Sequence, residues 1–188
     1  MKKTLIPFIF LLGVLFQSCT GPRGRDGLPG IDGQDGVDGT ALVGQTFEVE
    51  KVNFTAANGY SLLVTYTDAK LIDVRESDAV FVYILWEVTD SGSPVWRLLP
   101  QPIDMPKGVV YNFDYTPGDF SVFIDAPSDA LKASLAAEYT QNQTFRAVVV
   151  PSDFTARKGG SAVDFKDYEA VKKYFNLDES KITKLTVN

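Results

Sequence analysis

Apolar and polar residues alternate over short segments in the second part of the chain, which is typical of strands with one buried face. Four apolar side chains around Leu62 fall on one side, and Tyr111, Phe113 and Tyr115 alternate with their neighbours. Segment 46–54 alternates with a slip near its middle, which predicts an irregular strand. The segments predicted as strands are 46–54, 60–67, 79–88, 95–99, 109–115, 120–124, 144–150 and 181–187.

Segment 79–88 is apolar on both faces, which predicts a central strand that is buried on both sides. Two other segments have helical spacing instead. Residues 128–137 are rich in Ala and Leu, and residues 165–175 place four apolar side chains on one stripe. Asp164 and Asp167 resemble a capping pair, so we expect the second helix to begin near them.

Many short strands with turn signals between them, and no regular alternation of strand and helix, predict an all-β fold. We expect residues 42–188 to form one immunoglobulin-like β-sandwich, without its disulfide and with one or two short helices. Two regions of different composition precede it, at residues 1–18 and 19–41.

The chain starts with two lysines and an apolar run over residues 4–16. A bilayer-spanning helix needs about 20 residues, so this run has the length of a secretory signal instead. It ends at Ser18 and Cys19, the only cysteine in the chain. Segment 15–19 resembles the lipobox of bacterial lipoproteins of the Bacteroidetes type, although Phe16 stands where Leu is usual.

The resemblance implies that residues 1–18 are a signal peptide and that Cys19 becomes the N-terminus of the mature protein. Cys19 would then carry a diacylglyceryl thioether and an N-acyl chain such as palmitate. Two or more acyl chains hold a protein stably in a membrane. The resemblance therefore implies a lipid-anchored protein of the outer membrane, facing the periplasm or the cell surface. The alternative is an ordinary cleaved signal with an unmodified cysteine.

Glycine recurs at every third position through residues 21–41. These triplets resemble the collagen-like Gly-X-Y tracts of bacterial surface proteins, in which only Gly fits the crowded axis of three chains. The resemblance implies a homotrimeric stalk. Pro22 and Pro29 are the only prolines in the tract, so a flexible, charged linker in a single chain is an equal alternative. The repeating glycines are Gly21, Gly24, Gly27, Gly30, Gly33, Gly36 and Gly39.

Composition excludes several classes of function. The chain has no His and one Cys, which excludes a Ser-His-Asp triad, a His-ligated metal and a Cys-based metal cluster. A formal charge of -6 argues against nucleic acid as a partner. Asp73, Glu76 and Asp78 form a carboxylate cluster that we expect to be a solvated turn. We expect no catalytic residues, no metal site and no cofactor.

Trp86 and Trp96 flank a predicted hairpin loop at 90–94. They are expected to be core residues or, if exposed, to form an aromatic platform for a sugar ring. The apolar strand around Trp86 favours the core. Two functions remain open: a membrane-anchored lipoprotein with a structural or interaction role, and a tethered module that binds a carbohydrate, a protein or another ligand. We do not expect an enzyme.

Overall fold

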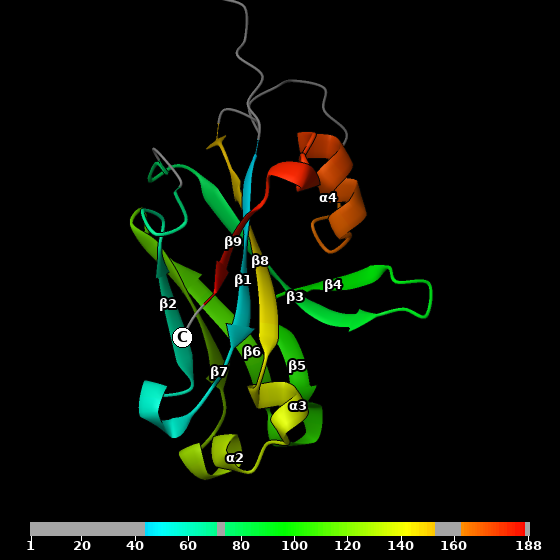
Figure 1. Ribbon diagram of the computed structural model, residues 1–188. Coiled ribbons are helices and arrows are strands. Elements are labelled where there is room, and N and C mark those ends of the chain that lie inside the picture. The colour runs from blue at the N-terminus through cyan, green and yellow to red at the C-terminus, as the bar shows by residue number, and fades with distance from the viewer. Residues whose placement is uncertain (1–43, 71–73, 153–162, 187–188) are drawn as a thin grey trace, which may run out of the picture. The chain divides into compact units, whose positions relative to one another are not determined.

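The computed structural model describes residues 44–70, 74–152 and 163–186, which form two β-sheets packed face to face (Figure 1). The described residues all belong to one compact unit. The predicted all-β sandwich is confirmed. Its immunoglobulin-like topology stays a prediction.

The larger sheet has five strands, and each of its three central strands runs antiparallel to the central strand beside it. The edge strand β9 runs parallel to β1. The predicted slip in the first strand is confirmed, because the pairing of β1 with β8 shifts register between Val49 and Val52. In order across the sheet, the strands are β4 (Pro94–Leu98), β3 (Ala79–Val88), β8 (Gln143–Val150), β1 (Gln45–Val52) and β9 (Thr183–Thr186).

The smaller sheet has four antiparallel strands, and one of them was not predicted. The predicted strand 95–99 stops before Pro100 and Pro102, which are breaker signals, but the chain forms β5 (Gln101–Asp104) with Pro102 inside it. Proline is tolerated there because β5 lies at the edge of the sheet, where one side of the strand makes no ladder hydrogen bonds. The strands are, in order, β2 (Ser61–Thr65), β7 (Asp119–Asp125), β6 (Val109–Tyr115) and β5 (Gln101–Asp104).

Two apolar clusters stabilise the domain. The larger one fills the space between the sheets, and the smaller one lies on the outer face of the five-stranded sheet beneath α4 (Tyr168–Phe175). Strand β3 contributes to both, since Val82 belongs to the first cluster and Tyr83 to the second. The prediction that this strand is buried on both faces is therefore confirmed.

The predicted helix at 165–175 is present, but it begins at Tyr168, because the side chain of Asp167 caps it by accepting a hydrogen bond from the Ala170 amide. Three residues of the predicted stripe, Tyr168, Val171 and Phe175, are buried. Short 3-10 helices also occur, at η2 (Ala56–Asn58), η3 (Met105–Lys107) and η5 (Glu179–Lys181).

The prediction of one helix at 128–137 is wrong. The chain forms two shorter helices, α2 (Asp129–Ala133) and α3 (Ala137–Thr140). The Ser134 hydroxyl donates a hydrogen bond to the Leu131 carbonyl (2.8 Å), a local bond of the kind that competes with a continuing helix. Ala136 is extended, with φ −65° and ψ 152°, which separates the two helices.

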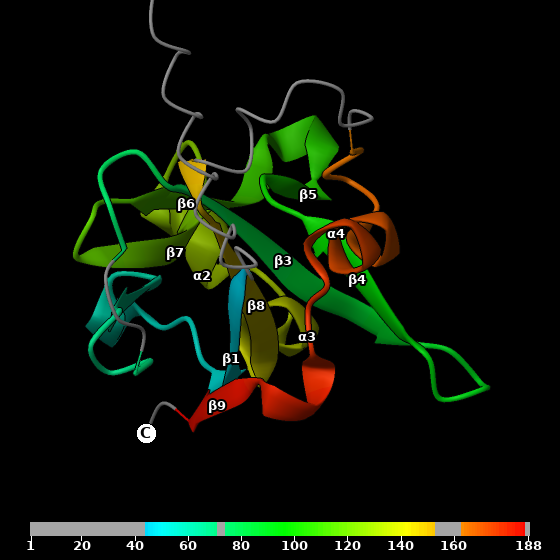
Figure 2. The same ribbon diagram turned by 90° about the horizontal axis from the view of Figure 1, so that it is seen from above.

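Within the part of the chain that the structure describes, no helix is both long and apolar enough to cross a membrane. Figure 2, which looks down on the domain from above, shows the β3–β4 hairpin extending beyond the rest of the larger sheet. Helices α2 and α3 lie together at the lower end of the domain in Figure 1, and α4 lies near the upper end.

Candidate functional site

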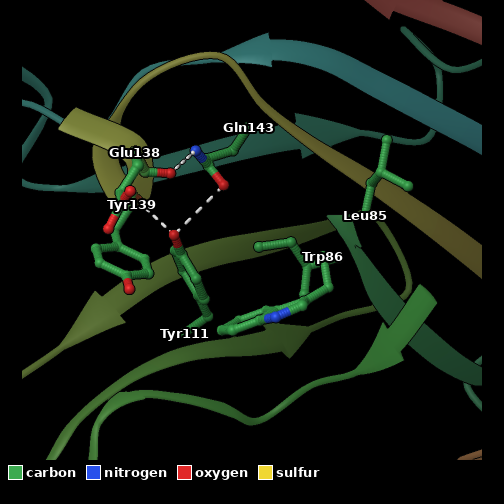
Figure 3. A pocket seen from close by; sticks show the side chains of 7 residues that line it. Leu85, Trp86, Tyr111, Glu138, Tyr139 and Gln143 are labelled. Carbon is green, nitrogen blue, oxygen red and sulfur yellow. Dashed lines mark hydrogen bonds between the residues drawn. The ribbon is translucent and has the colours of Figure 1, made fainter. Parts of the chain in front are cut away.

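A pocket of about 230 Å³ lies between the two sheets where β8 begins (Figure 3). Helix α3 and the end of β3 contribute to its wall. It combines aromatic side chains with a carboxylate and an amide, a lining of the kind that binds polar ligands containing rings. We call it the Trp86 pocket, and its lining residues are Ile84, Leu85, Trp86, Tyr111, Glu138, Tyr139 and Gln143.

Helix α3 is fixed to this pocket by hydrogen bonds to its backbone. The Tyr111 hydroxyl donates to the Tyr139 carbonyl (2.5 Å), and the Gln143 side-chain amide donates to the Glu138 carbonyl (2.8 Å). The same amide donates to the Gln141 carbonyl (2.7 Å). Burial raises the pKa of Tyr111, so its hydroxyl keeps the proton that it donates to the Tyr139 carbonyl up to a higher pH than an exposed tyrosine would.

Trp86 is half-buried, and one part of it packs against the sandwich core. It lies where the pairing of β3 with β4 is irregular, between Leu85 and Glu87. The guanidinium carbon of Arg97 lies 4.2 Å from the centre of a Trp86 ring, so this side chain already forms a cation–π contact. Trp86 is thus both a core residue and a lining residue.

Trp96 lies elsewhere, against the second cluster beneath α4. Its ring is 5.9 Å from that of Tyr168, and the guanidinium carbon of Arg146 lies 4.1 Å from its centre. A platform shared by Trp86 and Trp96 is therefore excluded in this fold. Neighbouring residues of a strand point to opposite faces, and Trp96 is paired with Leu85 rather than with Trp86.

Arg146 is the centre of a buried charge cluster next to Trp96. It forms ion pairs with Glu48, which is also buried, and with Glu179, at 2.6 Å. Its guanidinium also lies 4.7 Å from the ring of Tyr168. These contacts connect β8, β1, α4 and η5, so we assign the cluster a structural role.

A second pocket, of about 200 Å³, lies where β5, η3 and the start of β6 meet the α2–α3 segment, and it shares Tyr139 with the first. Most of its lining residues are apolar, and Asp104, Lys107 and Ser134 add polar groups. Asp104 and Lys107 form an ion pair at 2.9 Å. We call it the Leu135 pocket, and its lining residues are Ile103, Asp104, Lys107, Val109, Leu131, Ser134, Leu135, Ala136 and Tyr139.

Two carboxylates place negative charge near Tyr139. Hydrogen bonding to the Glu138 side chain, together with the negative charges of Glu138 and Asp104, raises the pKa of Tyr139. No Lys or Arg lines the Trp86 pocket, and the one lysine that lines the Leu135 pocket is paired with an aspartate. A negatively charged ligand is therefore disfavoured at both pockets.

The prediction that Asp73, Glu76 and Asp78 form a solvated turn is wrong for Asp78. Asp73 lies outside the described residues, and Glu76 is exposed. Asp78 is buried, and its carboxylate accepts hydrogen bonds from the backbone amides of Arg75 and Ser152, both at 3.1 Å. Asp78 therefore fastens two loops together, which explains its burial.

Of the residues predicted from the sequence, only Trp86 lies at the candidate site. Cys19 and the seven repeating glycines lie outside the described residues. Glu138, Tyr139 and Gln143 were not predicted, because they are polar or aromatic residues around a short helix and form no recognisable motif. Among the described residues, no group of His, Cys, Asp and Glu side chains could hold a metal ion.

Comparison with known proteins finds no matching family model, no significantly similar curated protein and no significantly similar solved structure.

Proposed function

We propose that this chain is a lipoprotein of the outer membrane that displays a β-sandwich on a collagen-like stalk or linker. In this proposal Cys19 carries the lipid, residues 19–41 separate the domain from the membrane, and the domain has a structural or interaction role. The order of the lipobox, the glycine repeat and the sandwich along the chain supports it.

The observation that carries the proposal is that the start of the described domain and the Trp86 pocket lie at opposite ends of the sandwich. The described domain begins at Gly44, which is packed so tightly that a Cβ there would lie 2.9 Å from Leu177 and 3.5 Å from the Cβ of Phe175. The first described residue therefore lies at the α4 end of the domain. The pairing of β1 with β8 runs from Gln45 opposite Val149 to Val52 opposite Gln143.

Gln143 lines the Trp86 pocket, so Gly44, where the described domain begins, and the pocket lie at opposite ends of β1. A strand rises about 3.3 Å per residue, so these ends are roughly 20 Å apart. In this proposal the α3 end, which is opposite the point where the chain enters the domain, is the end that contacts partners. This arrangement supports display as the purpose of the tether.

Lipidation is tested by replacing Cys19 with Ser in the full chain, expressed in a bacterium that processes lipoproteins. We expect the wild-type chain to incorporate a labelled fatty acid and to sediment with membranes. The C19S variant should lose the label and the membrane association, because the thioether cannot form. The measurement is in-gel detection of the label after membrane fractionation.

The matched control is Ser18→Ala, which keeps a small residue before the cysteine and should be labelled like the wild type. Fatty-acid labelling that persists in C19S would contradict the proposal, and so would a wild-type chain that is never labelled.

A second candidate function is a ligand-binding module of the envelope, tethered by a flexible linker. The Trp86 pocket favours it, because this pocket lies at the opposite end of β1 from Gly44 and combines aromatic and polar groups. The two functions are compatible, since a displayed domain can bind a ligand with its free end.

A further inference from the structure

The two pockets meet at one residue. Tyr139 lines both the Trp86 pocket and the Leu135 pocket, and its carbonyl is fixed by the Tyr111 hydroxyl. The α3 end of the domain therefore carries two adjacent hollows with Tyr139, whose backbone is fixed, between them. A ligand that extends across Tyr139 could occupy both.

We propose that these two pockets together bind a linear, neutral oligosaccharide, with one sugar unit in each pocket and the chain crossing Tyr139. This proposal deepens the second candidate function above and rests on it. It does not depend on lipidation of Cys19 or on trimer formation.

The size of the pockets supports sugar units as occupants. Drug-sized ligands occupy pockets of about 300–1,000 Å³, whereas these two have volumes of about 230 and 200 Å³. Each is suited to a single ring rather than to a large compact ligand. Two small pockets in a row fit a chain of repeating units better than one bulky molecule.

The chemistry of the lining also fits. A sugar ring has apolar C–H faces and a rim of hydroxyls, so it needs an aromatic surface and hydrogen-bonding groups in one pocket. Trp86 and Tyr139 supply the aromatic surfaces, whose negatively polarised faces attract C–H groups. The Glu138 carboxylate can accept hydrogen bonds from sugar hydroxyls, and Asp104 and Ser134 supply polar groups in the second pocket.

The charges of the pocket residues favour neutral sugars over anionic ones. Glu138 and Asp104 are acidic, and the lysine in the Leu135 pocket is already paired. Arg97 lies over the Trp86 ring but does not line the pocket. The whole chain also has a formal charge of -6. A polymer of uronic acids would therefore be repelled, and a neutral glycan would not.

The two tryptophans offer a direct assay, because they lie on opposite faces of the larger sheet. Trp96→Phe leaves Trp86 as the only indole in the full chain, and Trp86→Phe leaves Trp96. Each variant, purified in detergent, is titrated with gluco-oligosaccharides and manno-oligosaccharides of one to six units. Polygalacturonate serves as the anionic comparison.

We expect the fluorescence of the W96F variant to change saturably with at least one neutral series, and that of W86F to stay constant. Affinity should rise from one unit to the length that fills both pockets and then level off. No response of Trp86 to any neutral series would overturn the proposal. A response only to polygalacturonate would overturn it as well.

Calorimetric titration of the Tyr139→Ala variant tests whether the glycan crosses Tyr139, and it does not depend on Trp86 fluorescence. Removing an aromatic side chain shared by both pockets should weaken binding by about tenfold or more. Tyr115→Ala is the matched control, because Tyr115 is an exposed tyrosine at the opposite end of β6. It should change the affinity less than about twofold, and both variants should retain the wild-type circular dichroism spectrum.

Equal binding by wild type and Y139A would show that the glycan binds elsewhere, and this would also overturn the proposal. Failure here is distinguishable from failure of the display function. A chain that is lipidated at Cys19 but binds no neutral glycan would keep the proposed anchor and lose only the ligand.

Discussion

Arg146 shows how a single residue connects distant segments of this chain. It contacts a buried carboxylate from β1, an exposed carboxylate from η5, and the rings of Trp96 and Tyr168. Burying a charge is costly unless it is paired, and removing one partner leaves the other uncompensated. Arg146 and Glu48 are both buried, so they depend on each other.

We predict that Arg146→Ala lowers the free energy of unfolding by about 3–5 kcal/mol, because Glu48 would remain buried without its partner. The measurement is urea unfolding followed by circular dichroism. Arg97→Ala is the matched control, since Arg97 also lies over a tryptophan ring but has no ion pair among the described contacts. Its loss should cost about 1 kcal/mol or less. Similar effects of the two substitutions would contradict the structural role of the Arg146 pairs.

At the scale of elements, the glycine repeat differs from the helices and strands of the domain. Helix α4 can form within one chain. Its capping residue Asp167 is next to it in the sequence, and its buried stripe packs against a sheet of the same chain. A triple helix instead requires three chains, and Gly at every third position is necessary for it. The repeat therefore predicts an assembly that the domain alone does not require.

We predict that the full chain, solubilised in detergent and kept cold, has the molar mass of a trimer and that Gly30→Ala converts it to a monomer. Gly30 is the central glycine of the seven, and a Cβ there would occupy the triple-helix axis. Sedimentation equilibrium measures the mass. Gln34→Ala is the control, because an X-position residue points outward and should leave the trimer intact.

A monomeric wild-type chain would support the linker alternative. Trimers in both wild type and G30A would mean that the sandwich itself assembles.

At the scale of the whole molecule, buried tyrosines link stability to pH. Burial raises the pKa of Tyr168 to about 12, and it also raises the pKa values of Tyr66, Tyr83 and Tyr111. In the unfolded chain a tyrosine has a pKa of about 10. The folded state therefore holds these protons more tightly than the unfolded state.

Stability from these groups should be complete below about pH 10 and should be lost as the pH rises through the folded values. We predict that the urea midpoint falls steeply above pH 10, and that tyrosinate absorbance appears together with the loss of β-sheet circular dichroism. Full ionisation of the tyrosines while the sheet signal remains native would contradict the burial of these hydroxyls.

Many of the strand positions along the chain could be predicted because local patterns carry them. The alternation around Tyr111, the slip in β1 and the doubly apolar β3 all appear in the structure. Strand β5 was missed because an internal proline is a breaker signal, and only its edge position makes it acceptable. The division between α2 and α3 was missed because it depends on a local hydrogen bond of Ser134.

The sequence by itself determined the period-three glycines, the single cysteine after an apolar run, the acidic charge and the tendency to form strands. Only the tertiary structure decided which face each tryptophan occupies and that Glu138, Tyr139 and Gln143 meet Trp86. The physical reason is that periodicity within a strand fixes alternate faces but not the neighbouring strand. Pairing register and bulges are set by contacts between segments far apart in the chain, and they bring the two pockets together at Tyr139.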